Sequence, residues 1–239
     1  MNLDLLMLRT PRGAMVAALD YEPRRARGVA LAVGHGYSSS KHNLDALCAF
    51  TASHGFHTVS IDFPGHKLGA SGGRLESVAD LTDALAAAVD YARRTYGVPV
   101  YTMGHSMGAA TALRTCAADA QITGMISIAT GWRRPAALDA FAARGAVDLR
   151  SSYVDGLTLE EVVSATEPLL DPALAAIAGR PALYIAAERD GMVSRASADE
   201  LFRRAPEPKT FALIASDHTS AGEHARSTVL TWLNERHPR

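Results

Sequence analysis

The sequence predicts an α/β fold in which a mostly parallel, eight-stranded sheet carries helices on both faces. Short apolar runs alternate with longer amphipathic patterns along most of the 239 residues, which is the order expected of strand–helix units. Several of the runs are apolar throughout, as is typical of strands covered on both sides. No internal repeat or low-complexity tract interrupts this alternation.

Each expected strand is an apolar run bounded by glycine, proline or polar turn residues. The first two strands are joined through Pro11-Arg12-Gly13, a turn signal that favours an antiparallel hairpin. The strand at 28–36 ends in a glycine-rich turn, and the strand at 57–62 leads into a glycine-rich loop at 63–73. In order, the expected strands are 4–10, 14–21, 28–36, 57–62, 99–104, 122–130, 181–187 and 209–216.

Amphipathic patterns between these strands predict the helices. The pattern over 76–96 is the longest, and it is stopped by Gly97 and Pro99. Its apolar positions recur at helical spacing at Val78, Leu81, Leu85, Val89 and Tyr91. The expected helices are 41–54, 76–96, about 105–120 and 222–234.

The interval 131–180 does not continue the alternation. It holds short helical patterns at 135–143 and 158–165, separated by polar turns. We therefore expect a core made of 1–130 and 181–239, with 131–180 inserted as a small helical cap over the strand ends. A single irregular crossover connection is the alternative.

Composition suits one compact domain and narrows the function. Hydrophobic residues make up 48% of the chain, and the formal net charge is -1. Such a charge leaves no basic excess for a nucleic acid or an anionic membrane. No run approaches the ~18 apolar residues of a membrane-spanning helix, and the first residues lack a signal-peptide pattern, so we expect a cytoplasmic protein. Cys48 and Cys116 lie in apolar helical patterns and are expected to be buried free thiols.

One pentapeptide carries the strongest chemical signal. Gly104-His105-Ser106-Met107-Gly108 stands between an apolar strand and an alanine-rich helix. A serine raised on so tight a turn has a strained backbone, and glycines two positions away on each side remove the Cβ atoms that would collide. The start of the helix adds free N–H groups where an oxyanion can develop. Ser106 is therefore predicted as a nucleophile, the alternative being a glycine-bounded turn with an idle serine.

A nucleophilic serine needs a base and a carboxylate that orients the base. Asp190 follows the strand at 181–187, at the sheet edge where α/β folds place functional groups. Glu188 is its nearest rival. Asp155 and Asp171 lie within the expected cap and are weaker candidates.

The predicted base is His218. It follows the last strand, just ahead of the closing helix, which puts it on a loop at the same sheet edge as Ser106. A solvated loop histidine is the alternative, and Asp217 is held as a minor candidate for the acid.

An oxyanion hole needs two preorganised donors. One is expected from the N–H of Met107, and the other from the turn after 28–36, with the N–H of Tyr37 favoured. His35 and Gly36 in the same turn are predicted to contribute to substrate binding. Trp132 is a candidate for the wall of an acyl pocket, although core packing accounts for it equally well.

The loop Asp62-Phe63-Pro64-Gly65-His66 is expected to brace this turn. It lacks the arrangement of a phosphate-binding loop, and the chain has neither a dinucleotide fingerprint nor a Cys/His cluster with metal-ligand spacing. No cofactor and no metal are expected.

These motifs together resemble the α/β-hydrolase superfamily, and within it bacterial esterases similar to the serine aminopeptidase, monoacylglycerol lipase and feruloyl esterase group. Two departures stand out: Lys67-Leu68 lengthens the second loop, and Ala187 replaces a common glycine. The resemblance rests on His35-Gly36-Tyr37 with Lys41, Asp62-Phe63-Pro64-Gly65-His66 with Ser71-Gly72, Gly104-His105-Ser106-Met107-Gly108, the stretch 187–193 around Asp190, and Asp217-His218.

The resemblance implies hydrolysis of carboxylic esters through an acyl-enzyme on Ser106, in the EC 3.1.1 class. The expected partner is a small-molecule ester or related acyl substrate, with no nucleic acid and no membrane. A thioesterase, an amidase or peptidase, or a carbon–carbon bond hydrolase would use the same three residues. A non-catalytic binding protein on the same fold is a further alternative, and the sequence does not predict the oligomeric state.

Overall fold

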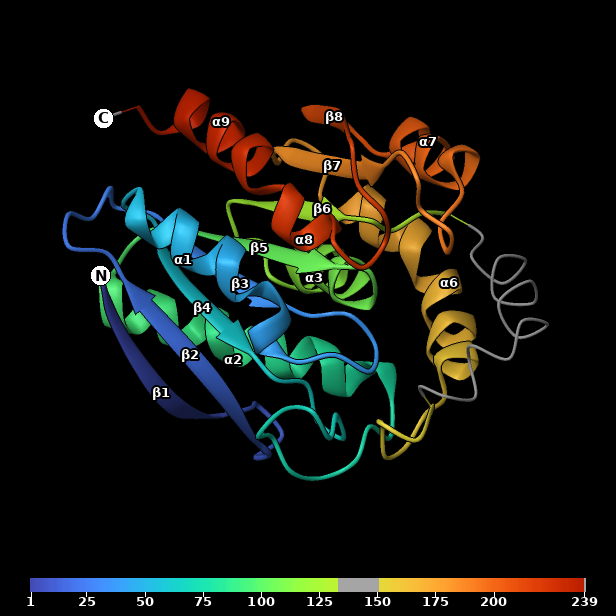
Figure 1. The fold of residues 1–239 in the computed structure, drawn as a ribbon, viewed down its shortest axis with the longest axis horizontal. Helices are drawn as coiled ribbons and strands as arrows, with labels where there is room; N and C mark the ends of the chain where they lie inside the picture. Colours follow the sequence, from blue (N-terminus) through green and yellow to red (C-terminus); the bar gives the residue numbers. More distant parts are fainter. Residues whose placement is uncertain (133–150, 239) are drawn as a thin grey trace.

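A single eight-stranded sheet runs through the residues that the computed structural model describes, which are 1–132 and 151–238 (Figure 1). The strand order is β1-β2-β4-β3-β5-β6-β7-β8. Strand β2 pairs antiparallel with β1 on one side and with β4 on the other. Every further pair in this order, from β4–β3 to β7–β8, is parallel. The predicted fold class is confirmed. The strands are β1 (Asn2–Arg9), β2 (Met15–Glu22), β3 (Ala30–Gly34), β4 (His57–Ile61), β5 (Val100–His105), β6 (Gly124–Ile128), β7 (Ala182–Ala187) and β8 (Lys209–Ile214).

Strand β3 is shorter than its apolar run suggests. The pattern predicted a strand over 28–36, but β3 ends at Gly34. His35 and Gly36 leave the sheet at the carboxyl end of the strand and begin the turn towards Lys41. This matters for function, because His35 and Gly36 are predicted to contribute to substrate binding, and the turn that they begin carries Tyr37, a predicted oxyanion donor.

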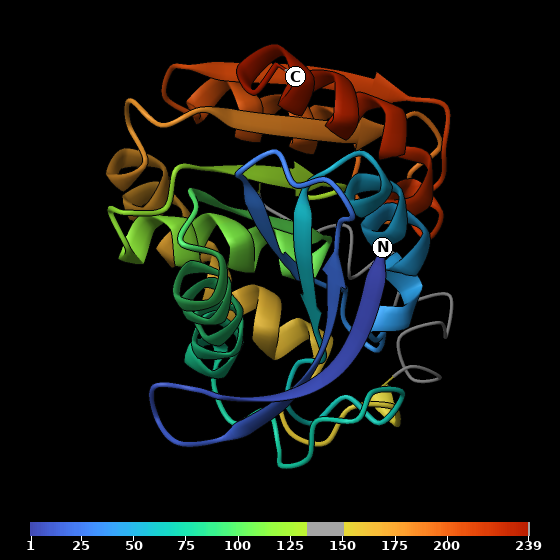
Figure 2. The ribbon, with the colours of Figure 1, turned by 90° about the vertical axis from the view of Figure 1, so that its left-hand side faces the viewer.

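Helices cover both faces of the sheet (Figure 2). In that view the green helices α2 and α3 lie on one side of the sheet and the blue helix α1 lies on the other. One face is covered by α1 (Asp45–Ser53), α8 (Ala221–His224) and α9 (Arg226–Arg236), with the 3-10 turn η1 (Lys41–Leu44) before α1. The other face is covered by α2 (Val78–Tyr96), α3 (Met107–Ala118), α6 (Leu159–Ala176) and α7 (Arg195–Arg204).

The alternation of side chains along β3 shows how the two faces are separated. Ala30 and Ala32 join the core beneath α2 and α3, whereas Leu31 and Val33 join the core beneath α1. Both cysteines are buried free thiols, as predicted. Within the described part of the chain, no helix is long and apolar enough to cross a membrane.

Helix α2 ends where the sequence predicted. Gly97 adopts a left-handed conformation with φ 63°, and its N–H bonds to the carbonyl of Arg93. Glycine accepts this conformation at little cost, so the helix stops one residue before it. At the other end, Asp80 accepts the N–H of Ser77 in a capping box.

Helix α6 is longer than the pattern at 158–165 predicted. It is continuous from Leu159 to Ala176 and contains Pro168 and Pro172, residues that ordinarily end a helical pattern. It packs against α3 and leads into β7, so it occupies the crossover between β6 and β7. The predicted helix at 135–143 lies outside the described residues, and the cap over 131–180 stays a prediction.

A buried ion pair joins the loops that follow β3 and β4. Lys41 is 2% exposed and Asp62 is fully buried, and their Nζ and Oδ2 atoms lie 2.5 Å apart. The backbone N–H of Lys41 donates to Oδ1 of Asp62, at 2.8 Å, and the N–H of Ala70 donates to Oδ2, at 2.7 Å. Burial alone would raise the pKa of Asp62, but its hydrogen bonds to Lys41 and Ala70 outweigh that effect and lower it.

Substituting Lys41→Met should lower the free energy of unfolding by about 3–5 kcal/mol, because it leaves a buried carboxylate without its partner. The matched control is Lys67→Met. Lys67 pairs with Asp155, and both side chains are about half exposed, so its loss should cost at most about 1 kcal/mol. Urea unfolding of both variants checks the prediction. Similar small losses for the two would contradict it.

Candidate active site

Ser106 stands on a sharp turn between β5 and α3. Its φ of 56° and ψ of -116° are strained for a residue with a side chain. The flanking glycines make the turn possible: a Cβ on Gly104 would lie 2.1 Å from the carbonyl oxygen of Gly108. A Cβ on Gly108 would lie 2.2 Å from the carbonyl oxygen of Gly34. Both glycines are therefore required by close backbone packing.

The three predicted catalytic side chains meet in one hydrogen-bonded line. The Ser106 hydroxyl donates to Nε2 of His218, with 3.0 Å between oxygen and nitrogen. The Nδ1–H of His218 donates to Oδ2 of Asp190, at 2.8 Å. Asp190 follows β7 and His218 follows β8, so the carboxyl ends of three parallel strands supply the three groups. This arrangement can transfer a proton from the serine to the imidazole.

Asp190 is fixed from its own loop. Its Oδ1 accepts the N–H groups of Met192 and Val193, both at 2.8 Å, which leaves Oδ2 for His218. Burial by itself would raise the pKa of Asp190. The hydrogen bond and charge interaction with His218, together with the two amides, outweigh burial and lower the pKa. The carboxylate is held ionised beside the imidazole.

The rival carboxylates lie elsewhere. Glu188 is exposed. Asp217 is also exposed, and it accepts the N–H of Ser220 ahead of α8. Asp155 pairs with Lys67, and Asp171 pairs with Arg204.

His105 is a part of the site that sequence reasoning missed. Its Nε2–H donates to the backbone carbonyl of His218, at 2.7 Å. The two rings also lie close, with 5.0 Å between their centroids. His105 therefore ties the His218 loop to the turn that carries Ser106. No motif could have signalled this contact, because position 105 accepts many residue types in the pentapeptide.

The two predicted oxyanion donors lie beside the nucleophile. Met107 is the first residue of α3 and directly follows Ser106. A Cβ on Gly36 would lie 3.5 Å from Cβ of Ser106, so the turn carrying Tyr37 passes very near. Within residues 1–132 and 151–238, neither N–H donates to a backbone carbonyl. Their role as donors to a substrate oxygen stays a prediction.

The imidazole of His35 lies behind this turn and is fully buried. Its Nε2 accepts the N–H of Phe63, at 3.0 Å, and its Nδ1–H donates to the carbonyl of Gly36, at 2.7 Å. Both ring nitrogens are thereby used within the chain. Burial lowers the pKa of His35 to about 3, so the ring is neutral at ordinary pH. If this turn binds substrate, it does so through its backbone and not through the His35 side chain.

Comparison with known sequences assigns the chain to a family. Residues 25–159 match the sequence profile of the family described as serine aminopeptidase, S33. The chain belongs to this family. It is a hydrolase-family protein with the α/β-hydrolase fold, as the motifs around Ser106 predicted. No curated protein sequence matches the chain.

Solved structures share the fold of this serine aminopeptidase family member over nearly its whole length. The esterase domain of a Rhodothermus marinus protein matches with a TM-score of 0.71 at 20% identity, covering 98% of this chain and 99% of that one. The Pyrococcus furiosus esterase Pf2001 gives 0.74 at 19% identity, covering 98% and 90%. The α/β hydrolase GrgF from Penicillium sp. sh18 gives 0.71 at 17% identity, covering 99% of each. At these identities the likeness establishes the fold.

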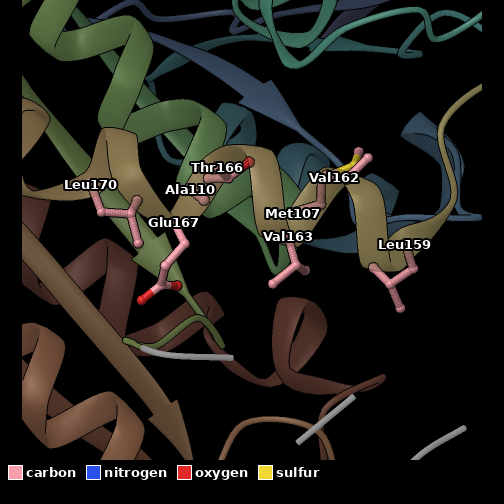
Figure 3. Close-up of a pocket in the computed structure, with 8 residues that line it drawn as sticks. All are labelled: Met107, Ala110, Leu159, Val162, Val163, Thr166, Glu167 and Leu170. Carbon is pink, nitrogen blue, oxygen red and sulfur yellow. The ribbon is translucent and has the colours of Figure 1, made fainter. Parts of the chain in front are cut away.

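A small pocket lies between α3 and α6 in this family member, and its lining includes Met107, the residue after Ser106 (Figure 3). Leu159, Val163, Glu167 and Leu170 project from the same side of α6. The pocket is mostly apolar, and its lining comes from α3 and α6: Met107, Ala110, Leu159, Val162, Val163, Thr166, Glu167 and Leu170.

Trp132 is not part of this lining. Its carbonyl accepts the hydroxyl of Ser197 in α7, and the guanidinium of Arg204 lies 4.3 Å from the centroid of its ring. Its place in an acyl pocket stays a prediction. In the described ranges no three His, Cys, Asp or Glu side chains gather as metal ligands.

Ser106→Gly should be more stable than Ser106→Ala by about 1–2 kcal/mol, because glycine adopts the strained backbone angles without a Cβ. The control is Ser164, an exposed residue inside α6. There the glycine variant should be less stable than the alanine variant by about 1 kcal/mol. Urea unfolding of the four variants gives the comparison. The same sign at both positions would contradict the strain at Ser106.

The free energy of unfolding should decrease as the pH is lowered, because folded His35 resists protonation. The unfolded chain takes up a proton near pH 6.5, whereas folded His35 takes one up only near pH 3, so lowering the pH in this range favours unfolding. Between pH 7 and 4.5 the wild type should lose about 2 kcal/mol more than His35→Asn. Urea unfolding at several pH values measures this. Parallel pH curves would show that His35 titrates normally in the folded protein.

Proposed function

We propose that the protein is a serine carboxylesterase of the EC 3.1.1 class, which forms an acyl-enzyme on Ser106. The observation that carries the proposal is the hydrogen-bonded line from Ser106 through His218 to Asp190, built on a strained turn. Strain of this kind persists only where the surrounding structure imposes it, and it clusters at functional sites. Membership of a hydrolase family supports the same conclusion.

In the proposed reaction, the Ser106 oxygen attacks the ester carbonyl carbon while Nε2 of His218 accepts the hydroxyl proton. Asp190 holds the other ring nitrogen and stabilises the imidazolium that forms. The N–H groups of Tyr37 and Met107 donate to the negative oxygen of the tetrahedral intermediate. His218 then gives its proton to the leaving alcohol, and a water molecule activated by His218 releases the acid.

The proposed substrate is a small-molecule ester whose acyl group enters the pocket beside Met107. The supporting observation is the mostly apolar pocket between α3 and α6, whose lining includes Met107, the residue after Ser106. We propose that no cofactor, nucleic acid or membrane takes part, and that the protein is cytoplasmic.

A second candidate is hydrolysis of an amide at the amino end of a peptide. The description of the matched family as a serine aminopeptidase favours it. The same Ser106, His218 and Asp190 would serve, because the nucleophilic steps for an ester and an amide are alike. A thioesterase, a carbon–carbon bond hydrolase and a binding protein remain predictions without an observation of their own.

The test begins with a fluorophosphonate probe and p-nitrophenyl esters from acetate to longer acyl chains. The probe should label Ser106, and kcat for the acetate should fall at least about 10⁴-fold in Ser106→Ala or His218→Ala. Ser53→Ala, at an exposed serine of α1, is the matched control and should keep full activity.

Each other outcome has a distinct meaning. Turnover of aminoacyl anilides in preference to esters would support the aminopeptidase. Probe labelling that persists in Ser106→Ala would overturn the assignment of the nucleophile. Absence of labelling and of turnover on every substrate would favour a binding protein.

A further inference from the structure

We propose that His35 is the positioning residue of the oxyanion hole: its imidazole holds the Gly36–Tyr37 peptide in the orientation that aims the N–H of Tyr37 at the substrate oxygen. The inference rests on the proposed function of Ser106. It assigns to the His35 side chain a role that acts through the backbone rather than by contact with substrate.

One peptide unit carries both the group that His35 binds and the predicted oxyanion donor. The carbonyl of Gly36 and the N–H of Tyr37 belong to the same planar trans peptide, so they point in opposite directions. Nδ1–H of His35 donates to that carbonyl at 2.7 Å. Holding the carbonyl on the His35 side therefore holds the N–H on the other side, where it has no backbone acceptor in the described part of the chain.

The orientation of this peptide needs to be held in place, because its carbonyl belongs to a glycine. A Cβ on Gly36 would lie 3.2 Å from Nδ1 of His105 and 3.5 Å from Cβ of Ser106, so a larger residue would crowd the nucleophile. The same absence of a side chain lets the backbone at Gly36 rotate between widely different conformations. A rotated peptide would present its carbonyl oxygen, an acceptor, to the oxyanion. The hydrogen bond from His35 opposes this rotation.

The backbone of the neighbouring loop decides which nitrogen of His35 carries the proton. The N–H of Phe63 can only donate, and it points at Nε2 of His35 from 3.0 Å. Nε2 must therefore be unprotonated, which leaves the proton of the neutral ring on Nδ1, opposite the Gly36 carbonyl. Burial, which lowers the pKa of His35 to about 3, keeps this neutral form in place. Phe63 thus sets the direction of the bond that holds the peptide.

The other end of the turn is fixed by the same loop. Asp62, the residue before Phe63, binds the side chain and the backbone N–H of Lys41. The ring of Phe63 also packs edge-on against His35, with 4.9 Å between centroids. Residues 62 and 63 thereby clamp the segment 35–41 at both ends, and the Gly36–Tyr37 peptide lies between the two clamps.

Two amide substitutions separate positioning from packing. In His35→Asn, the side-chain NH₂ falls near the place of Nδ1 and can still donate to the Gly36 carbonyl. In His35→Gln, the amide falls near the place of Nε2, where it can accept from Phe63 but no longer reaches that carbonyl. Both variants bury one amide in the same cavity, so a purely structural role predicts similar effects.

The experiment measures kcat and KM for p-nitrophenyl acetate, with melting temperature as the fold control. His35→Gln should lower kcat about 10²-fold, close to the loss of one oxyanion donor, with KM within about threefold of wild type. His35→Asn should keep kcat within about fivefold of wild type. A crystal structure of His35→Gln should show the Gly36 carbonyl turned towards Ser106.

The remaining outcomes decide between the two proposals. Equal kcat for the two variants, or losses that follow the melting temperature alone, would overturn the role of His35 while ester turnover by the wild type upholds the proposed function. A wild type that turns over no ester would overturn the proposed function itself, and the inference would fall with it.

Discussion

The geometry of the site depends on the hydrogen bonds that the buried carboxylate of Asp62 accepts. This carboxylate accepts three donors at once, from the side chain and backbone of Lys41 and from the backbone of Ala70. The loop after β4 wraps closely around it, since a Cβ on Gly69 would lie 2.4 Å from its Cγ. A buried ion pair brings little net stability compared with apolar packing. What it contributes here is position, because it joins the ends of β3 and β4 in one arrangement.

The rest of the site is assembled from loops at the same edge of the sheet. The turn after β3 brings Tyr37, the turn after β5 brings Ser106, and the loops after β7 and β8 bring Asp190 and His218. Parallel strands place all these turns side by side, although the residues are up to 181 positions apart in the chain. The strain at Ser106 is then carried by the packed backbone of its flanking glycines. His105 adds a cross-link, since it bonds to the carbonyl of His218.

The parallel sheet and the three residues Ser106, His218 and Asp190 could be predicted from the sequence, because glycine spacing and strand ends report directly on backbone geometry. The sequence could not predict the full length of α6, since Pro168 and Pro172 hide the continuation of the helix. It could not predict the contact of His105 with the carbonyl of His218, which depends on how two distant loops pack. Bracing by the loop after β4 was expected, but the hydrogen bonds of Phe63 and His35 appear only in three dimensions.

The most direct measurement is a crystal structure of the protein with a phosphonate bound covalently to Ser106, since this group imitates the tetrahedral intermediate. We expect a phosphonyl oxygen about 2.7–3.1 Å from the backbone nitrogens of both Tyr37 and Met107, with the Gly36 carbonyl still hydrogen-bonded to His35. An adduct whose oxygen points away from Tyr37, or a Gly36 carbonyl facing that oxygen, would contradict it.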